Sequence, residues 1–386
     1  MIITLTTEIK SYAKSIGIDD IKITNAESFP ELKEFLIEMR EKEYLSTLVH
    51  DDLEKISNPK EIVLEAKSVI VCAISYSVDD KYIFESRIRA KEELRGSLSR
   101  FAWGQDYHRV LGDRLDKLIE FIKTKKQRIE AFKFVDTGPT VDRALARRAG
   151  IGWQGKNCSI INPEYGSWIF LGGVITDLEL EYDSPIEDKC GDCRRCIDAC
   201  PTGALVDAYT LDSRKCLGYI TLSKGYLDEK QRKKMGTRLW GCDTCQSVCP
   251  QNQGAKLGDH EEFSPQTLEA YPDLISLLTL SNKEYKDKFM ITPMNWRGKR
   301  PIQRNAAIIL GNLKDRRAVP YLLDALSDPK PIVRANVAWA LGEIGDESAL
   351  DRLEKALLKE KDKQVIEELE KATERLGIVG QESENS

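Results

Sequence analysis

Cysteine spacing constrains this chain more than any other feature. Seven of the ten cysteines lie in two short runs that each end in Cys-Pro, over residues 190–201 and 242–250. The first run has the spacing Cys-x2-Cys-x2-Cys-x3-Cys-Pro, which is typical of thiolates that hold cubane [4Fe-4S] clusters. The second run lacks the first cysteine of that pattern, but Cys216 lies upstream and completes the eight ligands that two clusters need. The sequence therefore predicts two cubane clusters and a role in electron transfer.

The order of the cysteines also predicts how they are shared. In two-cluster ferredoxins the last cysteine of each run binds the other cluster. This crossing assigns one cluster to Cys190, Cys193, Cys196 and Cys249, and its partner to Cys200, Cys216, Cys242 and Cys245. Three alternatives remain: paired zinc sites, a disulfide framework in an oxidising compartment, and scattered core thiols. Zinc has no use for Cys-Pro endings, whereas Cys72, in an apolar run outside the pattern, is expected in the core.

Length and charge limit the possible domain number, cellular location and binding partners of the chain. A chain of 386 residues with 41% hydrophobic content predicts two or three domains in a multidomain α+β protein. The N-terminus has no signal-like apolar stretch and no apolar run approaches a membrane span, so we expect a cytoplasmic monomer without membrane contact. The net charge of −5 argues against a uniformly basic nucleic-acid coat, so a polyanion has to meet a local basic patch.

Three successive segments follow from the residue patterns. Residues 1–180 alternate strand-like and amphipathic helical stretches, which predicts a mixed α/β domain. Residues 181–262 contain the cysteine runs and predict a ferredoxin-like domain. Within residues 263–386, Ile302–Ala325 resembles Val333–Ala356 after a shift of 31 residues, which indicates a linker followed by a HEAT-like helical repeat.

Two stretches of the N-terminal segment carry candidate site residues. Asp136 follows an expected strand in an Asp-Thr-Gly-Pro turn, where it is either an active-site carboxylate or turn chemistry alone. Further on, Gly150–Cys158 contains three glycines in six residues, which would let the backbone approach a bulky ligand. This stretch lacks the spacing of a dinucleotide or phosphate-binding loop, and such turns are often only turns.

Basic residues gather in two places. The stretch 295–304 combines Trp296 with four basic side chains and suits phosphate contact and base stacking, or else it is a charged linker that caps a repeat helix. A second basic run, between the cysteine runs, includes Lys224, Arg232 and Lys233 and is either a solvated helix face or a polyanion contact.

Taken together, these features resemble the cobalamin-dependent epoxyqueuosine reductases over nearly the whole chain. The resemblance rests on residues 103–108, 135–138, 148–152, 155–157, 241–246 and 296–305. It implies reduction of the epoxide of epoxyqueuosine, at the wobble position of tRNA, to the alkene of queuosine with loss of water, the last step of queuosine biosynthesis. It also implies two [4Fe-4S] clusters, base-off cobalamin in the N-terminal domain, a tRNA anticodon stem-loop as partner and an external low-potential electron donor. No Asp-x-His-x-x-Gly stretch is present to supply a histidine ligand to cobalt, which agrees with a base-off cofactor.

The resemblance also implies residue roles. Asp136 would be the general acid beside the cofactor, with a pKa raised by burial against the corrin. The expected cobalamin contacts are Ser99, Arg100, Asp136, Gly155, Lys156, Asn157, Ser159 and Asp243. The family often has a cysteine where this chain has Ser99, so that contact is expected to differ here. The expected tRNA contacts are Lys224, Arg232, Lys233, Arg297, Lys299, Arg300 and Arg304.

Two other functions fit part of the sequence. A corrinoid reductive dehalogenase would share the cofactors, but it would have no use for a helical repeat with a basic face. A non-enzymatic ferredoxin-type electron-transfer protein would contain iron and sulfide without a corrin.

Overall fold

The computed structural model describes residues 4–79, 83–90, 92–265 and 268–384, the last seven by their backbone alone. The chain forms two compact units, each assembled from three separate segments. Unit 1 comprises residues 1–79, 105–216 and 243–264, and unit 2 comprises residues 80–104, 217–242 and 265–386. The segments of the two units alternate along the chain, whereas the sequence-based division uses successive domains with boundaries at residues 180 and 262. Those boundaries stay a prediction.

Unit 1 is built on a four-stranded antiparallel sheet in the order β1-β2-β7-β4. Its strands are β1 (Asp20–Asn25), β2 (Ser68–Ser75), β4 (Ala131–Phe134) and β7 (Ile169–Thr176). All eight residues of β2 are buried, as its continuous apolar run predicts for a strand covered on both faces. Cys72 lies in β2 and is fully buried, which confirms it as a core residue, and burial raises the pKa of its thiol.

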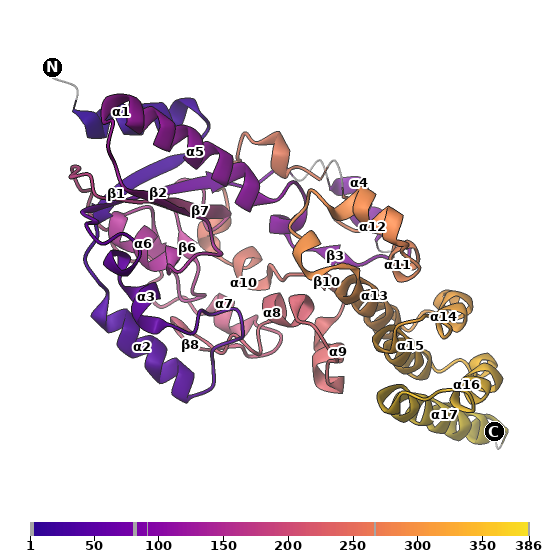
Figure 1. Ribbon diagram of the computed structural model, residues 1–386. Coiled ribbons are helices and arrows are strands. Elements are labelled where there is room, and N and C mark those ends of the chain that lie inside the picture. Colours follow the sequence, from indigo (N-terminus) through magenta and orange to yellow (C-terminus); the bar gives the residue numbers. More distant parts are fainter. Residues whose placement is uncertain (1–3, 80–82, 91, 266–267, 385–386) are drawn as a thin grey trace. The chain divides into compact units, whose positions relative to one another are not determined.

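Helices cover both faces of this sheet. Figure 1 shows α1 (Leu5–Ser15) and α5 (Tyr107–Lys125) over one face and α6 (Asp142–Ala149) against the other. On the α6 face, Val69 and Val71 pack with Leu145 and Ala149. Two further helices, α2 (Pro30–Glu41) and α3 (Leu53–Ser57), pack on each other.

The cysteine-rich part of unit 1 is made of short elements. A hairpin of β5 (Trp153–Gln154) and β6 (Ile160–Ile161) precedes it. The cysteine loops then contain α7 (Arg195–Asp198), a hairpin of β8 (Leu205–Asp207) and β9 (Thr210–Leu211), and α10 (Thr244–Ser247). In long helices and strands, the backbone N–H groups donate hydrogen bonds to backbone carbonyls of the same element or sheet. Short turns leave some N–H groups free to donate to sulfur.

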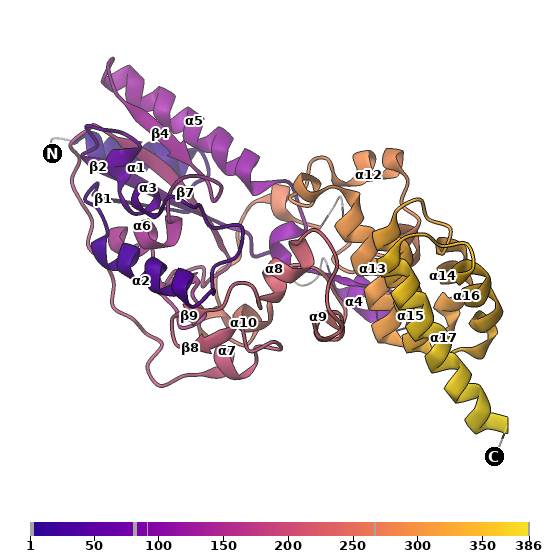
Figure 2. The ribbon, with the colours of Figure 1, turned by 60° about the horizontal axis from the view of Figure 1, so that its bottom comes forward.

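The C-terminal part of unit 2 is the predicted helical repeat, which Figure 2 shows as a stack of helices. Its helices are α13 (Lys299–Leu313), α14 (Val319–Ala325), α15 (Pro331–Ile344), α16 (Leu350–Leu357) and α17 (Lys363–Glu384). Gly311 and Gly342 occupy equivalent repeat positions, and a Cβ atom there would lie only 2.8 Å from Ala340 Cα and 3.0 Å from Ala372 Cα. The 31-residue repeat therefore includes the glycine at which one helix backbone approaches the next.

The rest of unit 2 contains α4 (Phe84–Arg89), β3 (Ser97–Leu98) parallel to β10 (Arg238–Trp240), α8 (Leu217–Leu222), α9 (Glu229–Met235), α11 (Leu274–Leu278) and α12 (Asn282–Phe289). Four of these elements, namely α8, α9, β10 and α11, pack against α13. Asn305 of α13 donates hydrogen bonds to the carbonyls of Thr221 and Leu239, at 2.9 and 2.8 Å, and so ties the repeat to this part of the unit. Within the described ranges of the chain, no helix has both the length and the apolar character needed to cross a bilayer.

Candidate functional site

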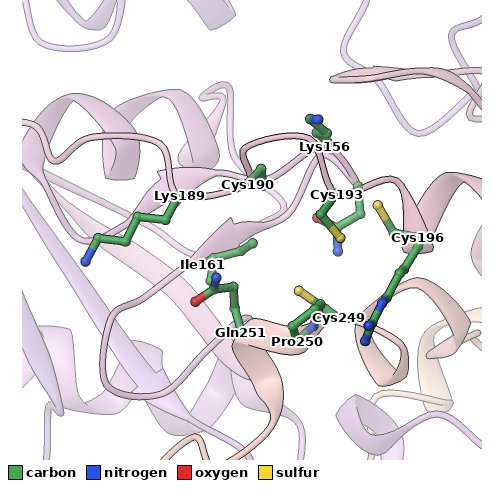
Figure 3. A pocket seen from close by; sticks show the side chains of 11 residues that line it. Lys156, Ile161, Lys189, Cys190, Cys193, Cys196, Cys249, Pro250 and Gln251 are labelled. Carbon is green, nitrogen blue, oxygen red and sulfur yellow. The ribbon is translucent and has the colours of Figure 1, made fainter.

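Four cysteines of unit 1 surround one pocket. Cys190, Cys193, Cys196 and Cys249 line it, the same four that the ferredoxin crossing rule assigns to one cluster. Cys190 and Cys193 come from the loop that leads into α7, Cys196 lies in α7 itself, and Cys249 comes from the turn after α10. Figure 3 shows the sulfur atoms of Cys193, Cys196 and Cys249 turned toward a common space. Tertiary structure thus joins a cysteine of the second run to three cysteines of the first.

The chemistry of this pocket fits an iron–sulfur cluster. Burial raises the pKa of the Cys190 thiol, while the backbone N–H of Lys156 acts in the opposite direction. The Trp153 indole nitrogen beside it is buried and has no hydrogen-bond partner in the protein. Over the described ranges, no group of three or more Cys, His, Asp or Glu side chains is placed to share one metal ion.

The other four predicted ligands are divided between the units. Cys200, Cys216 and Cys245 belong to unit 1, and Cys242 belongs to unit 2. Burial opposes ionisation of the Cys200 thiol, but backbone N–H groups of Leu205, Thr202 and Ala204 outweigh it and lower its pKa. A thiolate stabilised by backbone donors is the form that binds iron.

Asp136 lies in the loop after β4, at the predicted place. Its φ of 55° is in the left-handed region, which costs a residue with a side chain some free energy and has to be held by its surroundings. The Asp142 carboxylate accepts a hydrogen bond from the Asp136 backbone N–H at 2.7 Å, and a second from the Thr140 hydroxyl at 2.6 Å. Asp142 at the start of α6 therefore supports the conformation of the loop.

Two residues of α5 contact the Asp136 carboxylate. The Tyr107 hydroxyl donates to Asp136 Oδ2 at 2.6 Å, and the Tyr107 ring stacks on Phe170 of β7. His108 Nε2 lies 3.7 Å from the same oxygen, an ionic contact rather than a hydrogen bond. The other ring nitrogen, Nδ1, lies 2.7 Å from Asp106 Oδ1. Sequence reasoning gave Tyr107 and His108 no role, although both lie in the stretch 103–108 that supports the family resemblance.

The pKa values of Asp136 and His108 shift in opposite directions. Partial enclosure opposes ionisation of Asp136, but contacts with His108 and Tyr107 outweigh it and lower its pKa. Enclosure likewise opposes protonation of His108, but Asp106 and Asp136 outweigh it and raise its pKa to about 9. The Asp136 side chain is 64% exposed, and the rise in its pKa expected from burial against the corrin stays a prediction. At neutral pH the proton of this pair resides on His108.

The predicted glycine-rich loop is the β5–β6 hairpin, and it borders the cysteine pocket. Lys156 and Asn157 line the pocket, and the Lys156 ammonium donates to the Gly191 carbonyl. A Cβ at Gly155 would lie 2.6 Å from Ile161 Cδ1, so this glycine is needed for close packing inside the hairpin. Asn157 is buried and its side-chain nitrogen has no partner, which leaves a donor for a bound group. The Ser159 backbone N–H donates a hydrogen bond to the side-chain oxygen of Asn157 at 3.2 Å.

The remaining predicted cofactor contacts lie in both units. Ser99 and Arg100 belong to unit 2, where the buried Ser99 donates its N–H to the Trp240 carbonyl at 2.9 Å and Arg100 lies over the Trp103 ring. Asp243 belongs to unit 1 and directly precedes α10.

Two of the predicted tRNA contacts are wrong because their side chains are buried. Arg232 forms a bidentate ion pair with the buried Glu368. Arg304 is fully buried and donates to the carbonyls of Ser223 and Gly225, and burial lowers its pKa to about 10. Neither guanidinium can reach a phosphate.

The other predicted tRNA contacts are at least partly accessible. Lys224, Lys233 and Arg300 are exposed, whereas Arg297 and Lys299 are partly exposed. Arg297 stacks 3.7 Å from the centre of the Trp296 ring, and Lys299 donates to the Leu280 carbonyl at 3.0 Å. These five residues remain predicted tRNA contacts.

Three known families match separate parts of the chain. The 4Fe-4S double cluster binding domain matches residues 189–252, which confirms the two predicted clusters over the zinc, disulfide and core-thiol alternatives. HEAT repeats match residues 298–374 and confirm the helical repeat. The family described as epoxyqueuosine reductase QueG, DUF1730, matches residues 57–137.

Known proteins resemble the chain over almost its full length. The epoxyqueuosine reductase of Bacillus anthracis is 45% identical over 373 residues, which is 96% of this chain and 97% of that protein. A crystal structure of epoxyqueuosine reductase with a tRNA-Tyr epoxyqueuosine-modified tRNA stem loop has a TM-score of 0.90 and 44% identity, over 97% of this chain and 99% of that one. A structure of epoxyqueuosine reductase from Bacillus subtilis, with its aspartate catalytic loop swung out of the active site, has a TM-score of 0.89 and 44% identity, over 96% and 99%.

Proposed function

Because this chain belongs to the epoxyqueuosine reductase family, we propose that it reduces epoxyqueuosine in tRNA to queuosine, the last step of queuosine biosynthesis. The reaction opens an epoxide, expels its oxygen as water and leaves an alkene, so it consumes two electrons and two protons. The observation that carries the proposal is 45% identity across 96% of the chain.

Two [4Fe-4S] clusters and cobalamin are the cofactors of this reaction. The clusters carry electrons one at a time, and cobalamin supplies a strongly reducing metal centre. Cys190, Cys193, Cys196 and Cys249 hold one cluster, a role supported by their shared pocket. Cys200, Cys216, Cys242 and Cys245 hold the other, a role supported by their spacing and by the backbone donors to Cys200.

The proposed cobalamin contacts combine polar groups of the loops. Gly155, Lys156, Asn157 and Ser159 form one hairpin, and the unpartnered Asn157 nitrogen supports a bound group beside it. Ser99, Arg100 and Asp243 complete the proposed set.

Asp136 is the proposed proton donor, acting together with His108. The low pKa of Asp136 and the high pKa of His108 mean that the resting pair holds its proton on the imidazole. When bound substrate and cofactor exclude water, an ionised Asp136 becomes less stable, so the proton passes from His108 to Asp136 and on to the leaving oxygen. A general acid of this kind contributes about 10²–10⁴ in rate.

The anticodon stem-loop is the proposed macromolecular partner. We assign its phosphate contacts to Lys224, Lys233, Arg297, Lys299 and Arg300, supported by their accessible basic side chains. The enzyme acts as a monomer in the cytoplasm and takes electrons from an external low-potential donor. A dehalogenase or a simple ferredoxin would have no use for this stem-loop surface.

The test is direct conversion of the substrate. Protein reconstituted with iron, sulfide and cobalamin is incubated anaerobically with an epoxyqueuosine-bearing stem-loop and reduced methyl viologen, and the nucleosides are then analysed. Appearance of queuosine is expected, at a rate that depends on added cobalamin. A protein that contains both clusters and cobalamin but leaves epoxyqueuosine unchanged would contradict the proposal.

A further inference from the structure

Trp153 brings an indole ring to the cysteine pocket of unit 1. It lies in β5, where its register partner across the hairpin is Ile161. Ile161 lines the pocket together with Cys190 and Cys249 (Figure 3). Trp153, Ile161 and Cys249 belong to one buried apolar cluster, against which Cys190 packs. The indole therefore lies among two of the four cysteines that are proposed to hold the first iron–sulfur cluster.

The indole nitrogen of Trp153 is a buried hydrogen-bond donor without an acceptor. Trp153 is only 3% exposed, and its Nε1 atom has no hydrogen-bond partner in the described part of the chain. Buried polar groups in folded proteins are nearly always hydrogen-bonded, so this exception calls for an explanation. Phenylalanine would fill apolar space without burying an N–H group. The indole at this position is explained if a bound group supplies the acceptor.

A second tryptophan shows that an unpartnered indole does not by itself indicate a bound group. Trp339 of α15 is also 3% exposed, and its Nε1 atom is also buried without a partner. A cation lies over each ring: Lys189 Nζ is 5.7 Å from the centre of the Trp153 ring, and the Arg232 guanidinium is 5.2 Å from that of Trp339. The two sites differ in their sulfur atoms, because the helical repeat contains no cysteine. Of the two indoles, only Trp153 has proposed cluster ligands around it.

A [4Fe-4S] cluster supplies the acceptors that the protein alone lacks at this place. Its sulfides and the thiolates that bind it carry negative charge, and hydrogen bonds to these sulfur atoms help to set the reduction potential. Asn157 also lines the pocket with an unpartnered side-chain nitrogen, and its proposed partner is cobalamin. The buried N–H of Trp153 is thus a donor beside the cluster position that no other proposed contact uses.

We propose that the Trp153 indole N–H donates a hydrogen bond to a sulfur atom of the first cluster and raises the reduction potential of that cluster. The inference rests on the proposed function, which supplies the cluster ligands and the external electron donor. One electron passes from that donor to the cluster, no covalent bond forms or breaks, and the proton stays on the indole nitrogen. Because the reduced cluster is more negative, the N–H dipole stabilises it more than the oxidised cluster, and the potential rises.

A raised potential suits a cluster that receives electrons from outside the protein. Cys190, Cys193 and Cys196 are each partly exposed, so the pocket of the first cluster reaches the surface of unit 1. With a donor of given potential, the hydrogen bond from Trp153 increases the fraction of this cluster that is reduced. The same shift lowers the driving force for onward transfer, so Trp153 sets a balance between the two steps.

Trp153→Phe tests the role of the N–H group, because phenylalanine keeps an aromatic ring in the apolar cluster and has no donor. Trp339→Phe is the matched control, since it makes the same change at a buried, unpartnered indole in the cysteine-free repeat. Trp240 is not a neutral control, because its unpartnered indole lies two residues before Cys242 in the sequence.

The potentials of both clusters are measured in the reconstituted holoenzyme without substrate. The method is anaerobic redox titration followed by electron paramagnetic resonance. Cys249→Ser identifies the potential of the first cluster, which shifts or disappears when one of its ligands is replaced. Pulsed electron paramagnetic resonance of protein labelled with ¹⁵N in the indole ring reports whether a tryptophan nitrogen couples to the reduced cluster.

In Trp153→Phe, the equilibrium constant for reduction of the first cluster is expected to fall about tenfold, which is about 59 mV for one electron. The potential of the second cluster should stay unchanged, as should both potentials in Trp339→Phe. The original protein should show a ¹⁵N coupling to the first cluster that Trp153→Phe lacks. An unchanged or higher potential of the first cluster, an equal shift in Trp339→Phe, or the absence of this coupling would overturn the proposal.

A second substitution at position 153 covers the case in which Trp153→Phe does not assemble the first cluster. Benzothienylalanine has the shape of tryptophan with sulfur in place of the N–H group, and the same fall in potential is expected. These measurements use no substrate, so they are independent of the queuosine assay. Unchanged potentials in a protein that makes queuosine contradict only the role of Trp153, whereas a loaded protein that leaves epoxyqueuosine unchanged contradicts the proposed function.

Discussion

Replacing Arg232 with methionine is expected to destabilise unit 2 without weakening tRNA binding. The Arg232 guanidinium donates to Glu368 at 2.9 and 2.5 Å and to the Leu227 carbonyl at 2.9 Å. The side chains of Arg232 and Glu368 are only 8% and 4% exposed. The substitution therefore leaves a buried carboxylate that water does not reach.

The size of the effect follows from this burial. Removing one partner of a buried ion pair costs about 3–5 kcal/mol, because the remaining charge is uncompensated. Methionine fills part of the space of the arginine stem, so we expect the stability of unit 2 to fall by about 3 kcal/mol, near the lower end of this range. At about 1.4 kcal/mol for each factor of ten, local opening should become roughly a hundredfold more frequent. The double variant Arg232→Met with Glu368→Leu should lie within about 1 kcal/mol of the original protein, since replacing both charges leaves neither unpaired.

Hydrogen exchange measured on peptides from α9 and α17 tests this directly, because it reports local opening in a chain with several cooperative units. Lys233→Met is the matched control: Lys233 is 52% exposed and pairs with Glu229, so its loss should cost about 0.5 kcal/mol or less. Stem-loop affinity is measured in parallel by fluorescence anisotropy. A tenfold weaker stem-loop affinity of Arg232→Met, with exchange unchanged, would show that Arg232 contacts tRNA and that the argument from burial is wrong.

Three further predictions concern the substrate site and the tRNA surface. Asp136→Asn should lower turnover by at least about a hundredfold with iron and cobalamin contents unchanged, and loss of either cofactor would instead identify a structural role. Because the pKa of His108 is raised to about 9, its proton is present below that value, so kcat/KM should fall as pH rises through 9. In His108→Gln this alkaline limb should disappear along with most of the activity, and an unaltered profile would exclude His108 from proton delivery. Arg297→Ala and Arg300→Ala should each weaken stem-loop binding and reduce the slope of log affinity against log salt by up to about one; an affinity that is flat with salt would contradict phosphate contact.

Local sequence was sufficient for the features that depend on spacing along the chain. The first cysteine run identifies a cubane site because three of the four ligands follow one another within a short stretch, which has few ways to close around a cluster. The helical repeat could be recognised for a similar reason. Each helix pair packs mainly on the next pair, so the same residue types recur at equivalent positions, as glycine does at Gly311 and Gly342. The fold class, the two clusters and the helical repeat could all be inferred from such short-range patterns.

Burial and charge at single residues could not be read in this way. Arg232 and Lys233 are adjacent in one basic run, yet Glu368, 136 positions away, makes Arg232 an internal ion pair while Lys233 stays at the surface. The Asp136 turn was visible in the sequence. Its charge, however, depends on His108 of α5, and its left-handed backbone is supported by Asp142. Solvation and electrostatic energy depend on distances through space, and the residues that supply those distances come from parts of the chain that no local pattern connects.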